Sequence, residues 1–116
     1  LKNNEGFPDG SCIDNDNGLW NAQYNGSCVQ EFKEDGSYGN KIYIPCPQVT
    51  CVCIGGKNLD VVFITTAKEN WTSELDMKYP LAGSIFYAKL NLFSNAKGRK
   101  INMFDDKLIN YSKVIE

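Results

Sequence analysis

The fold is decided by residues 8–29, PDGSCIDNDNGLWNAQYNGSCV, where short β-forming runs alternate with turn signals. The run 19–24 carries large residues that favour a pleated sheet. Asn25-Gly26 follows it and is the strongest short hairpin signal, while Asn15-Asp16-Asn17-Gly18 supplies a polar turn before it. The pattern therefore predicts antiparallel strands that follow one another closely along the chain.

The same alternation continues to residue 90 and falls into two sets of strands. The first set predicts four strands and the second predicts three. Their expected ranges are 10–14, 19–24, 27–32 and 40–44, followed by 49–54, 60–66 and 83–90. The run 60–66 is apolar enough that we expect it to be covered on both faces. We expect one irregular turn in the polar connection 67–82.

The two sets share one order of strands and turns and recur with a period of roughly 40 residues, which is typical of propeller blades. A closed propeller needs at least about four blades. Blades without neighbours expose sheet edges and apolar faces. The sequence thus predicts an all-β chain that contains about two blades, one four-stranded and one three-stranded.

Length and charge limit the classes of function. The chain has 116 residues and a net charge of −2, so we expect neither nucleic acid nor a membrane as partner. Histidine is absent, which excludes imidazole bases and histidine-containing zinc sites. A catalytic mechanism would then have to use carboxylate, amide or lysine side chains, or a metal ion bound by oxygen ligands. The sequence shows no charged segment followed by an apolar one, as a signal peptide would, and no apolar run long enough for a membrane helix. We therefore expect a cytoplasmic location.

The cysteines are odd in number and fall within strand-like runs, so we interpret them as reduced, buried thiols. They are Cys12, Cys28, Cys46, Cys51 and Cys53. We expect Cys51 and Cys53 to point to opposite sheet faces, where they would share neither a disulfide nor a metal.

Asp9 is the acid with the most constrained setting, between Pro8 and Gly10. Proline fixes its own φ and glycine permits conformations closed to other residues, so Asp9 is expected at the entrance of a strand. A competing interpretation is a Pro-Asp-Gly turn without chemistry. Asp14 and Asp16 suggest a calcium loop, but the 12-residue pattern is absent and we interpret them as solvated turn acids.

Five motifs occur in one order: PDGSCID (8–14), LWNAQYNGSCV (19–29), QVTCVCIGGKNLD (48–60), VFITTA (62–67) and YPLAGSIF (79–86). In these motifs the chain resembles the SMP-30/gluconolactonase/luciferin-regenerating enzyme (regucalcin-like) family over about residues 7–100. The resemblance implies a six-bladed β-propeller with a divalent cation in its channel. Residues 1–101 would be its C-terminal blades, and the tail 102–116 has no match.

The resemblance also implies a site. Asp9 matches the aspartate that binds the metal and is proposed to act as general base when a sugar lactone is hydrolysed. The implied cation is calcium first, with zinc, magnesium or manganese as alternatives. The other ligands, a glutamate and two asparagines, belong to segments that this sequence does not contain. We therefore expect weak metal binding and no activity from this chain alone, with the remaining blades and a small sugar lactone as partners.

Two alternatives stay open. One is a non-catalytic, calcium-binding regulatory protein of the same lineage. The other is an unrelated small β-domain that binds partners through Trp20, Tyr24 and Trp71. Packing between blades is the favoured role for Trp20 and Tyr24, whereas Trp71 is expected to be exposed in the polar connection.

Overall fold

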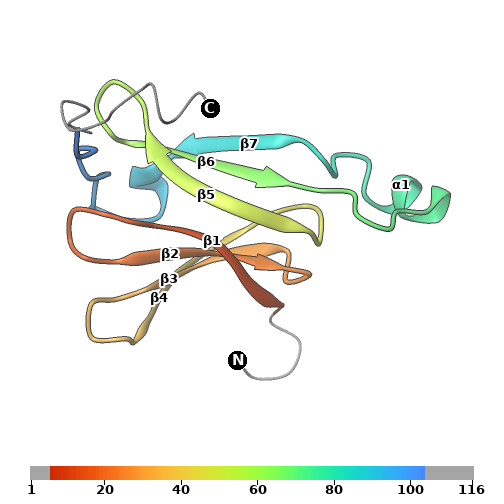
Figure 1. Cartoon of the computed structure of the whole chain (residues 1–116), viewed down its shortest axis with the longest axis horizontal. Helices are drawn as coiled ribbons and strands as arrows, with labels where there is room; N and C mark the ends of the chain where they lie inside the picture. The colour runs from red at the N-terminus through yellow and green to blue at the C-terminus, as the bar shows by residue number, and fades with distance from the viewer. Residues whose placement is uncertain (1–5, 104–116) are drawn as a thin grey trace, which may run out of the picture.

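The computed structural model describes residues 6–103 and shows two stacked antiparallel β-sheets (Figure 1). Strands follow chain order within each sheet, and consecutive strands pair antiparallel with one another. The first sheet contains β1 (Phe7–Ile13), β2 (Leu19–Tyr24), β3 (Cys28–Phe32) and β4 (Tyr38–Tyr43), and the second contains β5 (Val49–Gly55), β6 (Val61–Thr66) and β7 (Ile85–Lys89). The predicted sets of four and three strands are confirmed.

The connection between β6 and β7 differs from the expected irregular turn, because it contains a short helix, α1 (Ser73–Lys78). The Thr72 hydroxyl accepts a hydrogen bond from the Leu75 backbone N–H and caps the helix, and acidic residues occupy its first turn. Trp71 is half-buried, and its Nε1 donates to Asp76 Oδ1 at 2.8 Å. The expectation of an exposed Trp71 was therefore wrong.

The core lies between the two sheets. Alternate residues of each strand point inward, as the period of two in a β-strand requires. Trp20 is completely buried there, which confirms its predicted role in packing between blades. Burial of a large apolar side chain contributes about 1.5–3 kcal/mol. The buried apolar cluster comprises Trp20, Ala22, Val29 and Ile42 from the first sheet, Val49, Val52, Val62 and Ile64 from the second sheet, and Ile44, Cys46, Ala82 and Leu90 from the connections.

The opposite face of the second sheet is open. Phe63 of β6 is 36% exposed, so the expectation that residues 60–66 are covered on both faces was wrong for this chain. The reason is that the second sheet packs against the first on one side only.

No disulfide joins the five cysteines, but they are not all buried. Cys28 and Cys46 are buried, Cys12 is half-buried, and Cys51 and Cys53 are exposed. The last two were also expected on opposite faces, which was wrong, because residues two apart on a strand share one face. Burial raises the pKa of the Cys12 thiol to about 11, and the nearby thiols of Cys53 and Cys51 add to the rise.

A segment after β7 ties the two sheets together at one end. It begins with a 3-10 turn, η1 (Leu90–Leu92), and returns to the first sheet (Figure 1). The Gly98 N–H donates to the Leu59 carbonyl at 2.7 Å, and Gly98 also forms a β-bridge with Asp14. The β1–β2 turn and the β5–β6 turn therefore lie at the same end of the molecule. Most of the predicted tail, 104–116, lies outside the described residues.

Candidate functional site

Asp9 lies in a β-bulge near the start of β1. Pro8 pairs with Gln23 of β2 and Ser11 pairs with Asn21, so Asp9 and Gly10 interrupt the regular register. Bulges re-aim side chains and are common beside active sites. Asp9 is exposed, and within residues 6–103 its carboxylate has no hydrogen bond or ion pair. The position predicted at a strand entrance is thus a bulge within the strand.

Gly10 is required at the bulge by a close approach of two strands. A Cβ placed on Gly10 would lie 2.5 Å from Cys51 Sγ of β5, nearer than real Cβ atoms come to other atoms. Figure 1 shows β1 and β5 lying side by side where the sheets meet. We had expected glycine to supply conformational freedom, and the structure gives it a steric role instead.

A buried pair of amides holds the peptide of Asp9. Asn21 Nδ2 donates to the Asp9 carbonyl at 2.8 Å and to Ser11 Oγ at 2.6 Å. Gln23 Nε2 in turn donates to Asn21 Oδ1. Both amides are almost fully buried, and Gln23 Oε1 has no hydrogen-bond partner within residues 6–103. The backbone of Asp9 is therefore fixed while its carboxylate stays available.

Sequence reasoning missed this amide pair. Asn21 and Gln23 alternate with the buried Trp20 and Ala22 along β2, a pattern that predicts polar residues facing water. The available signal in the sequence was that Asn21 and Gln23 are two residues apart and therefore share one face of β2, the strand that pairs with the bulged part of β1. Their burial depends on the neighbouring strands, which no single strand reveals.

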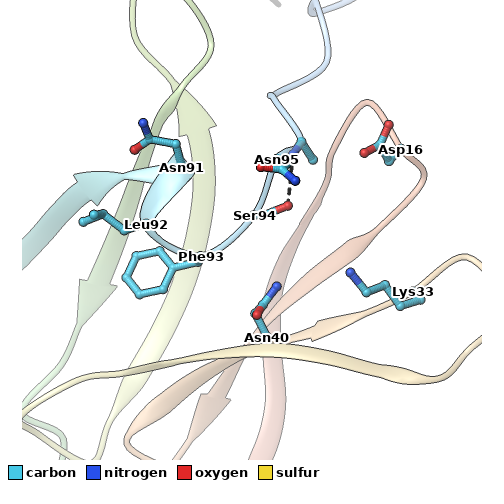
Figure 2. Close-up of a pocket in the computed structure, with 9 residues that line it drawn as sticks. Asp16, Lys33, Asn40, Asn91, Leu92, Phe93, Ser94 and Asn95 are labelled. Carbon is cyan, nitrogen blue, oxygen red and sulfur yellow. Dashed lines mark hydrogen bonds between the residues drawn. The ribbon is translucent and has the colours of Figure 1, made fainter.

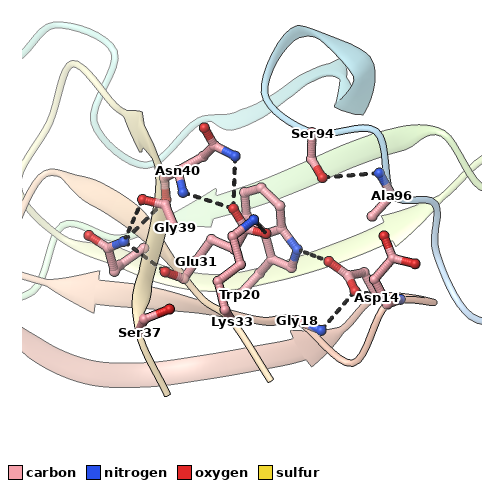
Figure 3. A network of polar contacts seen from close by, with 12 residues as sticks. Asp14, Gly18, Trp20, Glu31, Lys33, Ser37, Gly39, Asn40, Ser94 and Ala96 are labelled. Atoms are coloured by element: carbon pink, nitrogen blue, oxygen red, sulfur yellow. Dashed lines mark hydrogen bonds and ion pairs between the residues drawn. The ribbon is translucent and has the colours of Figure 1, made fainter. Parts of the chain in front are cut away.

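Asp14, at the far end of β1, is a buried structural acid. Its carboxylate accepts hydrogen bonds from Trp20 Nε1 at 2.8 Å, from the Gly18 N–H at 2.8 Å and from the Asp16 N–H at 2.9 Å (Figure 3). A Cβ on Gly18 would lie 2.6 Å from Asp14 Oδ2. The prediction of a solvated turn acid was wrong for Asp14, whereas Asp16 is indeed exposed.

Glu31 is a second buried acid with structural partners. It accepts hydrogen bonds from the Asn40 N–H and from Asn40 Nδ2, both at 2.8 Å, and it pairs with Lys33 Nζ at 3.0 Å (Figure 3). The Glu31 carboxylate is therefore already engaged in interactions that hold the fold, as the carboxylate of Asp14 is.

A polar hollow of about 480 Å³ lies at the Asp14 end of the molecule, between the first sheet and the segment after β7 (Figure 2). Lys33 and Asn40 line it, but both are bound to Glu31. Ser94 also lines it, and its hydroxyl accepts from the Ala96 N–H at 3.0 Å. Because these groups already hold the fold, the hollow is a weaker candidate than the Asp9 bulge.

Asp9 by itself does not make a metal centre. Across residues 6–103, no group of three or more histidine, cysteine, aspartate or glutamate side chains is placed to hold a metal ion. A carboxylate oxygen suits a hard cation, but stable binding needs several such ligands. The described residues thus provide one ligand that suits a cation and lack the further ligands that a stable site needs. In the same range, no helix has the length and apolar character needed to cross a membrane.

Comparison with known proteins gives the lineage. Residues 1–68 match the family model of the SMP-30/gluconolactonase/LRE-like region. The chain is 33% identical to a 6-deoxy-6-sulfogluconolactonase of Pseudomonas putida over 75% of its own length and 30% of that protein. It is 36% identical to human regucalcin over 74% of its length and 29% of that protein. The chain thus spans about 30% of the length of these relatives.

A solved structure agrees with the observed fold. The crystal structure of a calcium-binding protein, regucalcin, from Agrobacterium tumefaciens matches with a TM-score of 0.72 and 26% identity, covering 82% of this chain and 31% of that one. The two sheets are therefore blades of a β-propeller, as the motifs predicted. By its sequence match and its fold, this chain belongs to the SMP-30/gluconolactonase/LRE-like family.

Proposed function

We propose that this chain forms part of a divalent-metal-dependent sugar-lactone hydrolase and that Asp9 is its contribution to the active site. The observation that carries the proposal is the state of Asp9, whose peptide is anchored by buried Asn21 while its carboxylate is exposed and unpaired within residues 6–103. A fixed backbone with a free carboxylate is the arrangement that a ligand or a general base needs. The lactonase relative supports this substrate class.

The reaction is the opening of a cyclic ester by water. Water adds to the carbonyl carbon, the ring C–O bond breaks, and a hydroxy acid results. The Asp9 carboxylate accepts the proton that the attacking water loses. A divalent cation, when bound, polarises the carbonyl and lowers the pKa of water, and calcium is the first candidate, with magnesium, manganese or zinc as alternatives.

In the described residues no three acidic, cysteine or histidine side chains gather to hold a metal ion, so the remaining ligands for a cation at Asp9 must come from other blades. Asn21 donates a hydrogen bond to the Asp9 carbonyl, and Gln23 in turn donates to Asn21. These two bonds keep the carbonyl from turning toward the ligand. We therefore expect the 116-residue chain alone to bind calcium weakly and to leave sugar lactones intact.

A second candidate function is calcium binding without turnover. The match to regucalcins, one of them described as a calcium-binding protein, favours it. In this case Asp9 would act as a ligand only, and no proton transfer would depend on it.

A chimaera separates these functions. Residues 6–103 replace the matching segment of the Pseudomonas putida sulfogluconolactonase, and lactone hydrolysis is followed by the acid that it releases. We expect Asp9→Asn to lower kcat/KM by about 10²-fold or more, since a general base contributes 10²–10⁴-fold. The matched control is Asp16→Asn, an exposed acid in the β1–β2 turn, which should change kcat/KM less than about twofold.

Full hydrolysis by the Asp9→Asn chimaera would refute the proposed role of Asp9. A chimaera that binds calcium through Asp9 but hydrolyses no lactone would favour the second candidate. Thermal unfolding of each variant shows whether a loss of activity reflects chemistry or a loss of fold.

A further inference from the structure

The peptide between Asp9 and Gly10 has two orientations open to it. Rotation of this peptide changes the ψ of Asp9 and the φ of Gly10, and it leaves the rest of the chain nearly in place. A positive φ is strained for most residues but open to glycine. In the structure the φ of Gly10 is not positive. Because the contact with Cys51 requires glycine here, the bulge also acquires an orientation that a larger residue would forbid.

The two orientations differ in what Asp9 presents to a ligand. In the observed one, the Asp9 carbonyl points toward β2 and accepts a hydrogen bond from Asn21 Nδ2 at 2.8 Å. In the other one, the carbonyl would point away from β2 and Asn21 would lose its acceptor. The chemistry at the bulge therefore depends on which orientation is held.

The direction of the hydrogen bonds that hold it follows from the first acceptor. A carbonyl oxygen only accepts, so Asn21 has to present its Nδ2 group to Asp9. Asn21 Oδ1 then faces Gln23, which has to donate through Nε2. We call this series, from the Asp9 carbonyl through Asn21 to Gln23, the amide relay. Each member fixes the orientation of the next, so the relay requires a hydrogen-bond donor at residue 23.

The amide relay ends on an unpartnered acceptor. Gln23 is 2% exposed, and its Oε1 has no hydrogen-bond partner within residues 6–103. Such a group costs free energy, and most buried polar groups are satisfied. Turning the Gln23 amide around would not help, because Oε1 would then face Asn21 Oδ1. Buried Gln30 differs, since its Nε2 donates to the carbonyls of Glu31 and Asn40 and so only joins the strands.

We propose that Gln23 is a positioning residue for the Asp9 site. Acting through Asn21, it locks the peptide between Asp9 and Gly10 in the orientation that turns the carbonyl toward β2 and leaves the carboxylate to the ligand. A side chain at residue 23 that cannot donate frees Asn21 and, with it, the peptide. The inference rests on the proposed function, but the lock itself can be measured without catalysis.

The first test is hydrogen exchange of the Asn21 side-chain amide in the 116-residue chain, followed by NMR. Its Nδ2 group donates to the Asp9 carbonyl and to Ser11 Oγ, the latter at 2.6 Å. Hydrogen-bonded, buried amide protons exchange slowly until the structure around them opens. Exchange of this group therefore reports how firmly the amide relay holds Asp9.

Gln23→Met keeps a buried side chain of similar length but removes the donor. We expect the Asn21 side-chain amide to exchange at least about 10-fold faster, relative to the backbone N–H of Val29 in the core. The matched control is Gln30→Met, which lies directly opposite Asn21 in the register and should change the same ratio less than about twofold. Circular dichroism checks the fold of each variant, and Gln23→Leu is the second variant if Gln23→Met does not fold.

The second test uses the lactonase chimaera. Because small displacements of a catalytic group reduce rates strongly, we expect Gln23→Met to lower kcat/KM by about 10-fold and Gln30→Met by less than about twofold. Asn21→Leu should lower it at least as much as Gln23→Met does. Adding Gln23→Met to Asn21→Leu should have no further effect, because Gln23 acts through Asn21.

Gln23→Glu tests the requirement for a donor. A protonated Glu side chain can donate to Asn21 Oδ1, whereas its carboxylate cannot. The ratio of its kcat/KM to that of the unmodified chimaera should therefore fall as the pH is raised from about 6 to about 9, and the ratio for Gln23→Met should stay constant. The titratable side chains nearest in the register are Asp9, Cys28 and Tyr43. They are present in both proteins, so their own titration cancels in the ratio.

Unchanged Asn21 exchange in Gln23→Met, additive losses in the double variant or a constant ratio for Gln23→Glu would each overturn the inference. Full hydrolysis by Asp9→Asn would refute the proposed function instead, and the exchange experiment would still decide whether the lock exists. Loss of activity in Asp9→Asn with full activity in Gln23→Met would refute the role of Gln23 alone.

Discussion

The two ends of β1 place their aspartates in opposite surroundings. Asp14 is completely buried and its carboxylate accepts three hydrogen bonds from nearby donors. Asp9, five residues earlier, is exposed, and its carbonyl rather than its carboxylate is held, by Asn21. The same residue type thus has its carboxylate bonded within the fold at Asp14, whereas at Asp9 the carboxylate has no hydrogen bond or ion pair within the described residues.

The comparison teaches how to distinguish structural from functional acids in such a blade. A structural acid has both carboxylate oxygens bonded to nearby donors, as Asp14 has to the β1–β2 turn and to Trp20. Asp9, which we propose to be functional, instead has a fixed backbone and an unoccupied carboxylate. Exposure alone does not distinguish them, because Asp16, in the β1–β2 turn, is exposed as well.

The largest expected effect is that of Asp14→Ala. It removes a charged acceptor from Trp20 Nε1 and from two backbone N–H groups, which are left buried or half-buried without it. Hydrogen bonds to charged groups contribute about 1.5–3 kcal/mol each and are not additive, so we expect a loss of about 3–5 kcal/mol in the free energy of unfolding. Urea unfolding at one fixed protein concentration measures it, because assembly would add to stability.

Asp16→Ala is the control for this experiment and should change the free energy of unfolding by less than about 0.5 kcal/mol. If Asp14→Ala yields no folded protein, Asp14→Asn keeps the shape and one acceptor oxygen and should lose less. Equal stability of the Asp14 and Asp16 variants would show that the buried network does not hold the turn.

A smaller effect is expected at the bulge from Gly10→Ala. The added Cβ collides with Cys51 Sγ, and overpacking of this kind costs about 1–3 kcal/mol. Cys51→Ala removes the sulfur but leaves the Cβ of residue 51, which would itself lie 2.8 Å from the new methyl group. The double variant should therefore recover only part of the loss, and a double-mutant cycle in urea quantifies the coupling. Full additivity would mean that β1 and β5 do not touch there.

Much of the fold was predictable because it depends on local signals. Alternating large residues and the Asn25-Gly26 signal located β2 and β3 to within a residue, and Asn25 has a φ of 62° in that turn. The burial of Asp14 was not predictable, since it depends on Trp20 and on a segment that includes Arg99, whose Nε donates to the Asp14 carbonyl at 3.1 Å.

The candidate site was predictable only in part. The resemblance selected Asp9, but the sequence did not reveal the bulge, the anchoring by Asn21 or the steric need for Gly10. These features arise from the register between β1 and β2 and from the contact between β1 and β5. The exposure of Cys51 and Cys53 has the same origin, because it depends on which surfaces lie beside the second sheet.

The most direct test of the contrast within β1 is the free energy of unfolding of Asp9→Asn, measured in urea against the unmodified chain at the same concentration. The fold uses the Asp9 peptide and leaves its carboxylate unpaired within the described residues, so we predict a change of less than about 0.5 kcal/mol. A loss of about 2 kcal/mol or more would contradict the account, because it would make Asp9 a structural acid like Asp14.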